Sequence, residues 1–200
     1  MCLREVLNDH IPVTGTDGPQ PEETIGFNLN HLCIRIRDPE VSLKFYRDVL
    51  GLRRIFTVDG NAYTVYYLGY PKDAGKHQSG EELLNERLHR SGLLELIHVH
   101  GSENDNWPAY TQDHPYRRGF CHIGITVPDM HAAMARMKEH NVKIIKDIGE
   151  LPTSKMFGLK GADEGGVELE PRFAEPVRRI AFVEVSKIEG IFPGRTLTSF

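Results

Sequence analysis

An internal repeat limits this chain to folds built from two similar modules. Laying the second copy on the first puts His122 on His31 and Asp129 on Asp38, and both pairs are 91 positions apart. A repeat of this length indicates two related units rather than one continuous sheet. It also predicts that His31 and His122 occupy equivalent places in the two units.

The first copy reads as a strand followed by a helix. Residues 30–38 alternate between polar and apolar side chains, which is typical of a strand with one buried face. The helix that follows places Val41, Phe45 and Val49 on one face, and Gly51 is expected to end it.

The second copy repeats this order. Residues 120–128 alternate as a strand, and the next helix carries Met130, Met134 and Met137 at the spacing of a buried stripe. Further strand-like stretches follow each helix, at residues 53–58, 63–70 and 93–100 in the first copy and at residues 142–148, 155–160 and 167–171 in the second.

These patterns predict an α+β fold with four segments. Residues 1–26 are rich in Pro, Gly and Asp without a strand or helix period, so we expect an extended N-terminal arm. The first module spans residues 27–117 and contains a polar insert with a short helix at residues 71–91. The second module spans residues 118–171, and residues 172–200 form a C-terminal extension with some strand character of its own.

Composition excludes several classes of partner. The 24 basic and 28 acidic side chains give a net charge of −4, so we expect neither nucleic acid nor a membrane surface as a partner. No apolar run reaches the roughly 18 to 20 residues of a membrane helix, and the first ten residues become charged before a signal-peptide core could form. Three cysteines without a C-x-x-C spacing indicate a reducing compartment, so we expect a cytoplasmic protein. We expect Cys33 and Cys121 to be buried as small apolar residues.

Each copy pairs a histidine in its first strand with a carboxylate in its last strand. In the first copy Glu95 lies in an apolar strand, where a charged group is costly unless it is paired or ligated. In the second copy Glu168 and Glu170 are two positions apart and share one strand face. Two imidazoles and two carboxylates can bind Zn²⁺, Ni²⁺, Co²⁺ or Mn²⁺, so we predict a metal site that also includes His31 and His122.

Strand alternation decides which neighbouring side chains face this site. Arg35 shares its strand face with His31 and should look into the same cleft. By the same alternation, His98 and His100 face away from Glu95, so we do not expect them to be ligands.

Four segments in a fixed order carry a resemblance to a known family. They are HLCIRIRDPEVSLKFYRDVLGL at residues 31–52, LLELIHVHGSEND at 93–105, YRRGFCHIGITVPDM at 116–130 and Lys-Met-Phe at 155–157. Together they resemble glyoxalase I, the lactoylglutathione lyases of the vicinal oxygen chelate superfamily. The resemblance covers about residues 27–171.

The resemblance implies a fold, a reaction and a ligand set. The fold is two βαβββ modules, and the chain would be a homodimer. The metal ligands would be His31, Glu95, His122 and Glu170, holding Zn²⁺ or Ni²⁺. The family isomerises the hemithioacetal of methylglyoxal and glutathione to S-lactoylglutathione, with a glutamate moving the proton between adjacent carbons, which implies Glu170 and Glu95 as catalytic residues.

The resemblance also implies contacts with glutathione. Arg35 and Arg118 stand where the family's glutathione-binding arginines stand, and Lys155 and Met156 match positions near the substrate. One departure is Val99, which replaces an asparagine that usually contacts the γ-glutamyl group. This departure predicts a lower affinity for glutathione or a different thiol.

The sequence leaves the fourth ligand open between neighbouring glutamates. The family's usual turn before this ligand is absent here. Counting the family's spacing from Gly166 selects Glu170, whereas counting from Gly165 selects Glu168. We assign Glu170, and Glu189 in the C-terminal extension is a third candidate.

Two alternative functions follow from the same residues. An Fe(II) ring-cleaving dioxygenase would need two histidines, one carboxylate and open positions for O₂, and a fourth protein ligand argues against it. A non-catalytic homologue would bind a small molecule after losing the last glutamate ligand.

Overall fold

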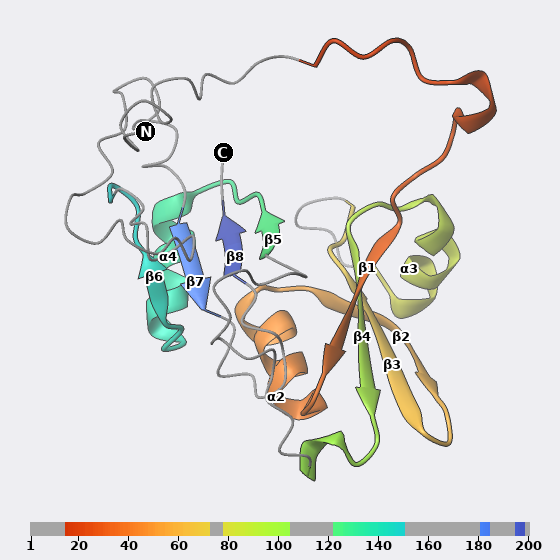
Figure 1. The fold of residues 1–200 in the computed structure, drawn as a ribbon. Helices are drawn as coiled ribbons and strands as arrows, with labels where there is room; N and C mark the ends of the chain where they lie inside the picture. Colours follow the sequence, from red (N-terminus) through yellow and green to blue (C-terminus); the bar gives the residue numbers. More distant parts are fainter. Residues whose placement is uncertain (1–14, 73–77, 105–121, 151–180, 185–194, 199–200) are drawn as a thin grey trace, which may run out of the picture. The chain divides into compact units, whose positions relative to one another are not determined.

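The chain forms two sheets with the same strand order (Figure 1). The computed structural model describes residues 15–72, 78–104, 122–150, 181–184 and 195–198. One four-stranded sheet has the order β1-β4-β3-β2 and the other the order β5-β8-β7-β6. The chain divides into two compact units, one around each sheet. The shared order confirms the predicted duplication and the α+β class.

The first unit has the elements that its sequence predicts. The strands form where apolar and polar residues alternate, and the polar insert carries the expected short helix. The elements are a 3₁₀ turn at Glu22–Thr24, β1 (His31–Ile36), α2 (Pro39–Leu43), a π-helical turn at Lys44–Val49, β2 (Arg53–Asp59), β3 (Tyr63–Gly69), α3 (Gly80–Glu86), a 3₁₀ turn at Arg87–His89, β4 (Leu93–Val99) and a 3₁₀ turn at Ser102–Asn104.

The helix after β1 forms as predicted, but its buried face differs at one end. Asp38 caps α2, because its carboxylate accepts hydrogen bonds from two backbone N–H groups of the first turn. Phe45 and Val49 are buried as expected, whereas Val41 is 38% exposed and Tyr46 is buried instead. The π-helical turn explains the difference, since its wider spacing rotates the later residues relative to those of α2.

The two faces of the first sheet are covered differently. On one face Leu93 packs with Ile55 and with Leu83 of α3, and all three are buried. On the other face Ile34 and Leu96 face each other across β1 and β4 and are almost fully buried. Because α3 covers only the beginning of β4 on the first face, the residues further along that face remain more accessible.

The second unit repeats the order of the first. Its elements are β5 (His122–Ile125), α4 (Met130–Glu139), β6 (Ile144–Lys146), β7 (Ala181–Glu184) and β8 (Arg195–Thr198). Asp129 caps α4 as Asp38 caps α2. Met134 and Met137 are buried as predicted, and Met130 is partly buried.

The last two strands of the second sheet come from beyond residue 171. β8 pairs in parallel with β5, as β4 pairs with β1. The sheet therefore includes strands from the segment that the sequence suggests is an extension. The strands predicted at residues 155–160 and 167–171 lie outside the described residues, and the segment boundaries remain predictions.

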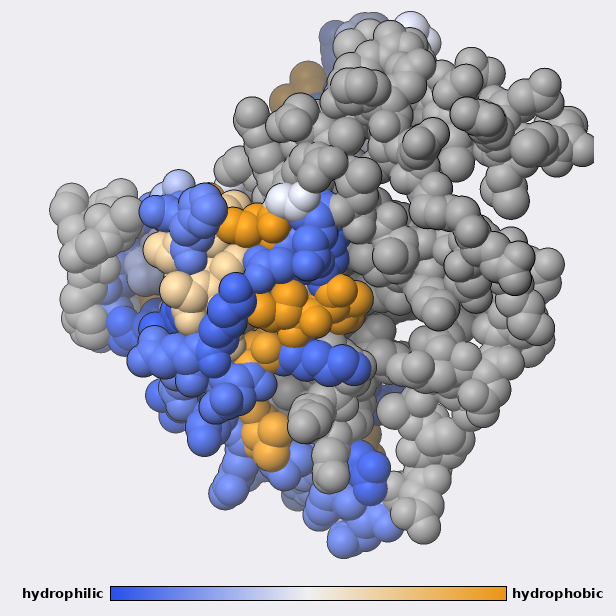
Figure 2. All heavy atoms as spheres, turned by 90° about the vertical axis from the view of Figure 1, so that its left-hand side faces the viewer, coloured by the Kyte–Doolittle hydropathy of each residue, from blue (hydrophilic) through white to orange (hydrophobic). Residues whose placement is uncertain are grey.

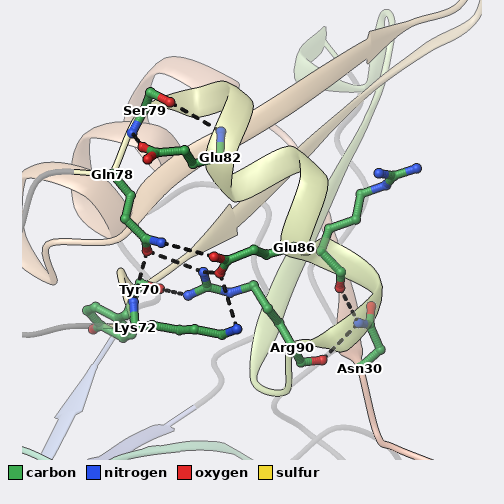
Figure 3. A network of polar contacts seen from close by, with 9 residues as sticks. Asn30, Tyr70, Lys72, Gln78, Ser79, Glu82, Glu86 and Arg90 are labelled. Atoms are coloured by element: carbon green, nitrogen blue, oxygen red, sulfur yellow. Dashed lines mark hydrogen bonds and ion pairs between the residues drawn. The ribbon is translucent and has the colours of Figure 1, made fainter.

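A buried arginine ties the first unit together at the starts of β1 and β4 (Figure 3). Arg90 is 7% exposed, and its guanidinium donates to Glu86, to Gln78 and to the backbone carbonyl of Tyr70. Its own carbonyl accepts a hydrogen bond from the side chain of Asn30, the residue just before β1. The network therefore fixes the segment that leads into β1.

We expect Arg90→Met to lower the free energy of unfolding by about 2 kcal/mol or more, because it takes the buried guanidinium away from the Tyr70 carbonyl and from Glu86, which keeps only Lys72 and Gln78 as partners. Urea unfolding followed by circular dichroism measures this loss. Arg54→Met is the matched control, since Arg54 is exposed on β2 and its loss should change stability by no more than about 0.5 kcal/mol. Equal stability of the two variants would contradict a structural role for the network.

The surface of the described residues is mainly hydrophilic on the face shown in Figure 2, with hydrophobic side chains between the hydrophilic ones. Phe27 and Leu29 are each 76% exposed in the segment that leads to β1.

No helix in the ranges that the structure describes is long and apolar enough to cross a bilayer.

Candidate metal site

A row of side chains crosses the first sheet from one edge to the other. The strand register aligns Phe56 on β2 with Tyr67 on β3, Tyr67 with Glu95 on β4, and Glu95 with Cys33 on β1. Residues aligned in register lie on the same face of a sheet, and His31 joins them because it is two positions before Cys33. The sheet thus brings a histidine and a glutamate from distant parts of the sequence onto one face.

His31 and Glu95 are close enough to share a cation. Nε2 of His31 lies 3.2 Å from Oε2 of Glu95. Two ligand atoms about 2.1 Å from one metal ion lie about 3.0 Å apart at a right angle and about 3.4 Å apart at a tetrahedral angle. The observed distance falls between these values, so the pair has both the donor types and the spacing of two adjacent metal ligands.

The orientation of the His31 ring is set by Asn30. Nδ1 of His31 lies 2.9 Å from Oδ1 of Asn30. The amide nitrogen of Asn30 donates to the carbonyls of Arg87 and Arg90, which turns Oδ1 toward the imidazole. A proton on Nδ1 leaves the lone pair on Nε2, which is the tautomer that a metal ion requires. The network around Arg90 therefore extends to the candidate ligand.

Both carboxylate oxygens of Glu95 accept hydrogen bonds. The hydroxyl of Tyr67 donates to Oε2, and the thiol of Cys33 lies 3.5 Å from Oε1. Loss of water around the sulfur, together with the charge of Glu95, raises the pKa of Cys33 to about 11. Burial of the hydroxyl and its bond to Glu95 raise the pKa of Tyr67 well above its ordinary value. Both groups are therefore neutral donors at physiological pH.

The structure corrects one prediction about the cysteines. Cys33 is exposed and lies on the face of the candidate site, whereas we expected it to be buried. Its neighbours Leu32 and Ile34 point to the opposite face, and in β1 the buried residues are Ile34 and Ile36. Alternation places Cys33 on the same strand face as His31, and the general tendency of cysteine to be buried was the wrong guide to its exposure. Cys121 lies outside the described residues.

The structure places some of the predicted site residues and leaves others undescribed. Arg35 is exposed on the face of His31, as expected. His98 lies on the opposite face from Glu95, as alternation predicts, and bonds Glu103 there. His122 is the first residue of β5, the place that His31 has in β1, and nothing is described of its side chain. The remaining predicted residues lie outside the described ranges: Arg118, Lys155, Met156, Glu168, Glu170 and Glu189.

The described part of the site is therefore a half-site. In the ranges that the structure describes, no group of three or more His, Cys, Asp or Glu side chains is arranged to hold a metal ion. His31 and Glu95 fit a cation as two donors and need further ligands. Tyr67 is the residue of this site that the sequence did not reveal, because its place beside Glu95 depends on the register between β3 and β4.

Comparison with known proteins identifies the family. Residues 28–170 match the model of the Glyoxalase/Bleomycin resistance protein/Dioxygenase superfamily. A lactoylglutathione lyase of Pseudomonas putida is 30% identical over 172 residues, which are 82% of this chain and 95% of that protein. A lactoylglutathione lyase of Pseudomonas aeruginosa is 33% identical over 122 residues, 60% of this chain and 69% of that protein.

A solved glyoxalase I has a similar fold. The glyoxalase I of Leishmania major superposes with a TM-score of 0.51 at 20% identity, over 87% of this chain and 86% of that chain. Two sheets of equal strand order, a histidine at the start of the first strand of each and a family match over most of the length agree with one another. The chain belongs to the Glyoxalase/Bleomycin resistance protein/Dioxygenase superfamily, also called the vicinal oxygen chelate superfamily.

Proposed function

We propose that this protein is a lactoylglutathione lyase, which isomerises the hemithioacetal of methylglyoxal and glutathione to S-lactoylglutathione and so removes methylglyoxal. The observation that carries the proposal is the His31–Glu95 pair, whose atoms have the spacing of two metal ligands. The relatives named lactoylglutathione lyase, one of which aligns along nearly its whole length, support the same reaction.

A divalent cation would be held by His31 and Glu95 together with His122 and Glu170. When bound, it would stabilise the negative charge that develops on the substrate oxygens as a carbon-bound proton leaves. Zn²⁺ and Ni²⁺ both accept imidazole and carboxylate ligands, so the donor set is compatible with either ion.

The two glutamates would have different roles. Hydrogen bonds from Tyr67 and Cys33 restrain both oxygens of Glu95, which favours a fixed ligand. Glu170 would then be the mobile base. It would take the proton from the carbon that bears the sulfur and the hydroxyl, and return it to the neighbouring carbon that was the ketone. The hydroxyl proton of the first carbon must also pass to the oxygen of the former ketone, and the product then carries a thioester and a secondary alcohol.

Arg35 would bind a carboxylate of glutathione. Arg35 lies four residues after His31 on the same exposed face of β1. Arg118 would bind the second carboxylate. Contacts of this kind act equally in the ground state and the transition state.

We therefore expect Arg35→Gln to raise KM for the hemithioacetal about tenfold or more while kcat changes little. Steady-state kinetics at saturating metal measure the two constants separately. Arg54→Gln is the matched control, because it removes an exposed charge from β2. Arg37→Gln is unsuitable, because Arg37 bonds the backbone of Glu103. A fall in kcat at constant KM would contradict the assigned role of Arg35.

One experiment tests the function and its rivals together. The purified chain is loaded with Zn²⁺ or Ni²⁺, and thioester formation from methylglyoxal and glutathione is followed by ultraviolet absorbance. Turnover that is lost with a chelator and restored by metal is the expected result. Metal binding without turnover would favour a non-catalytic binding protein, and O₂ uptake with Fe²⁺ and a catechol would favour a ring-cleaving dioxygenase.

We also propose that the protein is a cytoplasmic homodimer. The proposal is supported by the resemblance to glyoxalase I and by the small number of cysteines. Light scattering of the purified chain measures its mass in solution, and a monomer would contradict the dimer.

A further inference from the structure

We infer that Tyr67 is a positioning residue for the metal site, acting through Glu95. The inference rests on the proposed function, because it assumes that Glu95 is a ligand, and it adds a residue that the family match does not assign. Tyr67 belongs to β3, so the inference adds a third strand of the first sheet to the two, β1 and β4, that carry its proposed ligands.

The geometry places the hydroxyl of Tyr67 where it can hold Glu95 in one orientation. The hydroxyl donates to Oε2 of Glu95, the same oxygen that lies 3.2 Å from Nε2 of His31. The hydroxyl oxygen is also 3.3 Å from that nitrogen. A carboxylate oxygen has two lone pairs, so Oε2 can accept from Tyr67 and still coordinate a cation beside His31.

The aromatic ring of Tyr67 is itself held in place. It stacks on Phe56 with ring centroids 4.4 Å apart and meets the edge of His31 at 5.2 Å. Phe56 and Tyr67 also pack against the apolar cluster under α3. The hydroxyl is thus carried on a rigid support, and it restrains Glu95 more than a mobile donor would.

Cys33 holds the other oxygen of the same carboxylate. Its sulfur lies 3.5 Å from Oε1, so donors on β3 and β1 flank Glu95 on β4. Sulfur is a weak donor, which makes Tyr67 the stronger of the two restraints. Without the hydroxyl, Glu95 could rotate about its side-chain bonds, and ordering it would cost part of the metal-binding free energy.

The test is Tyr67→Phe, which removes only the hydroxyl and keeps the ring between Phe56 and His31. We expect the dissociation constants for Zn²⁺ and Ni²⁺, measured by competition with a chromogenic chelator, to rise about ten- to hundredfold. We also expect the visible spectrum of the Co²⁺-loaded protein to change. Tyr66→Phe is the matched control, because Tyr66 is the next residue of β3 and pairs with Leu96 on the other face. It should bind metal like the parent protein.

A double-mutant cycle shows whether the hydroxyl acts through Glu95. In a Glu95→Gln background, adding Tyr67→Phe should change the dissociation constant by less than about threefold, because the amide no longer offers the same charged acceptor. An undiminished effect in that background would overturn the inference, as would a Tyr67→Phe protein with the parent's affinity and Co²⁺ spectrum, or an equal loss in Tyr66→Phe.

Failure of the proposed function gives a different result. If Glu95→Ala keeps the parent's metal affinity, Glu95 is not a ligand, and the metal site and the inference built on it are both wrong. If Glu95→Ala loses the metal while Tyr67→Phe does not, the site stands and only the role of Tyr67 is wrong.

Discussion

Replacing Glu95 with alanine is expected to remove most of the bound metal and to lower kcat/KM by at least about a hundredfold. The reason is that the substitution removes one of the four proposed ligands, the one beside His31, and the three that remain hold a divalent ion less tightly. The fold should persist, because Glu95 is only partly buried and its loss opens no apolar cavity. Metal content after dialysis, together with the hemithioacetal assay, measures both losses. His122→Ala should have the same effect if the repeat places an equivalent ligand in the second unit.

A second histidine–glutamate pair, His98 and Glu103, offers a matched control for Glu95. His98 and Glu103 lie 3.0 Å apart on the opposite face of the sheet. Glu103→Ala breaks that pair and should leave metal content and kcat unchanged. Stoichiometric metal and near-parental activity in Glu95→Ala would show that the active site lies elsewhere.

Replacing Glu170 with glutamine is expected to lower kcat by about 10² to 10⁴ while most of the metal stays bound. An amide oxygen can still coordinate a metal ion, but it cannot take up a proton, and a positioned base contributes a factor of this size. Glu168→Gln, two positions earlier in the sequence, is the matched control and should lower kcat only slightly. Metal analysis and steady-state kinetics on the two variants separate ligation from proton transfer.

The other outcomes of this comparison identify the base directly. An essential Glu168 with a dispensable Glu170 would mean that the altered turn shifts the ligand by two residues. Little effect from either substitution in an active enzyme would contradict both assignments and direct the same test to Glu189.

Local sequence patterns were sufficient to predict the strands and helices of the first unit and β5, α4 and β6 of the second. Alternation located β1 and β5, and aspartates before helical patterns located the starts of α2 and α4. The buried face of α2 could not be predicted fully, because the π-helical turn changes the period and nothing in the composition of that segment signals it. β7 was only indicated by the strand character of its segment, which we interpreted as part of an extension, and β8 was not predicted.

The candidate site could be predicted where it depends on strand phase and not where it depends on strand order. The alternation of side chains along each strand was enough to predict that His31 and Arg35 share one face and that His98 lies on the opposite face from Glu95. The contact between Tyr67 and Glu95 requires that β3 lies beside β4 in one particular register, which a sequence pattern does not specify. The prediction that Cys33 is buried was wrong, because it followed the general burial tendency of cysteine and not the exposure of the strand face that Cys33 shares with His31.

The parallel pairing of β1 with β4 has a consequence for the order of folding. Cys33 and Glu95, which lie opposite each other, are 62 residues apart, whereas Asp59 and Thr64 at the β2–β3 turn are five apart. Closing the longer loop costs about 2 kcal/mol more entropy than closing the hairpin. We therefore expect β1 to dock late, after a fast local meander of β2 and β3 has formed. His31 and Glu95 meet only at that step, so metal capture would mark the end of folding in this unit and could not nucleate it.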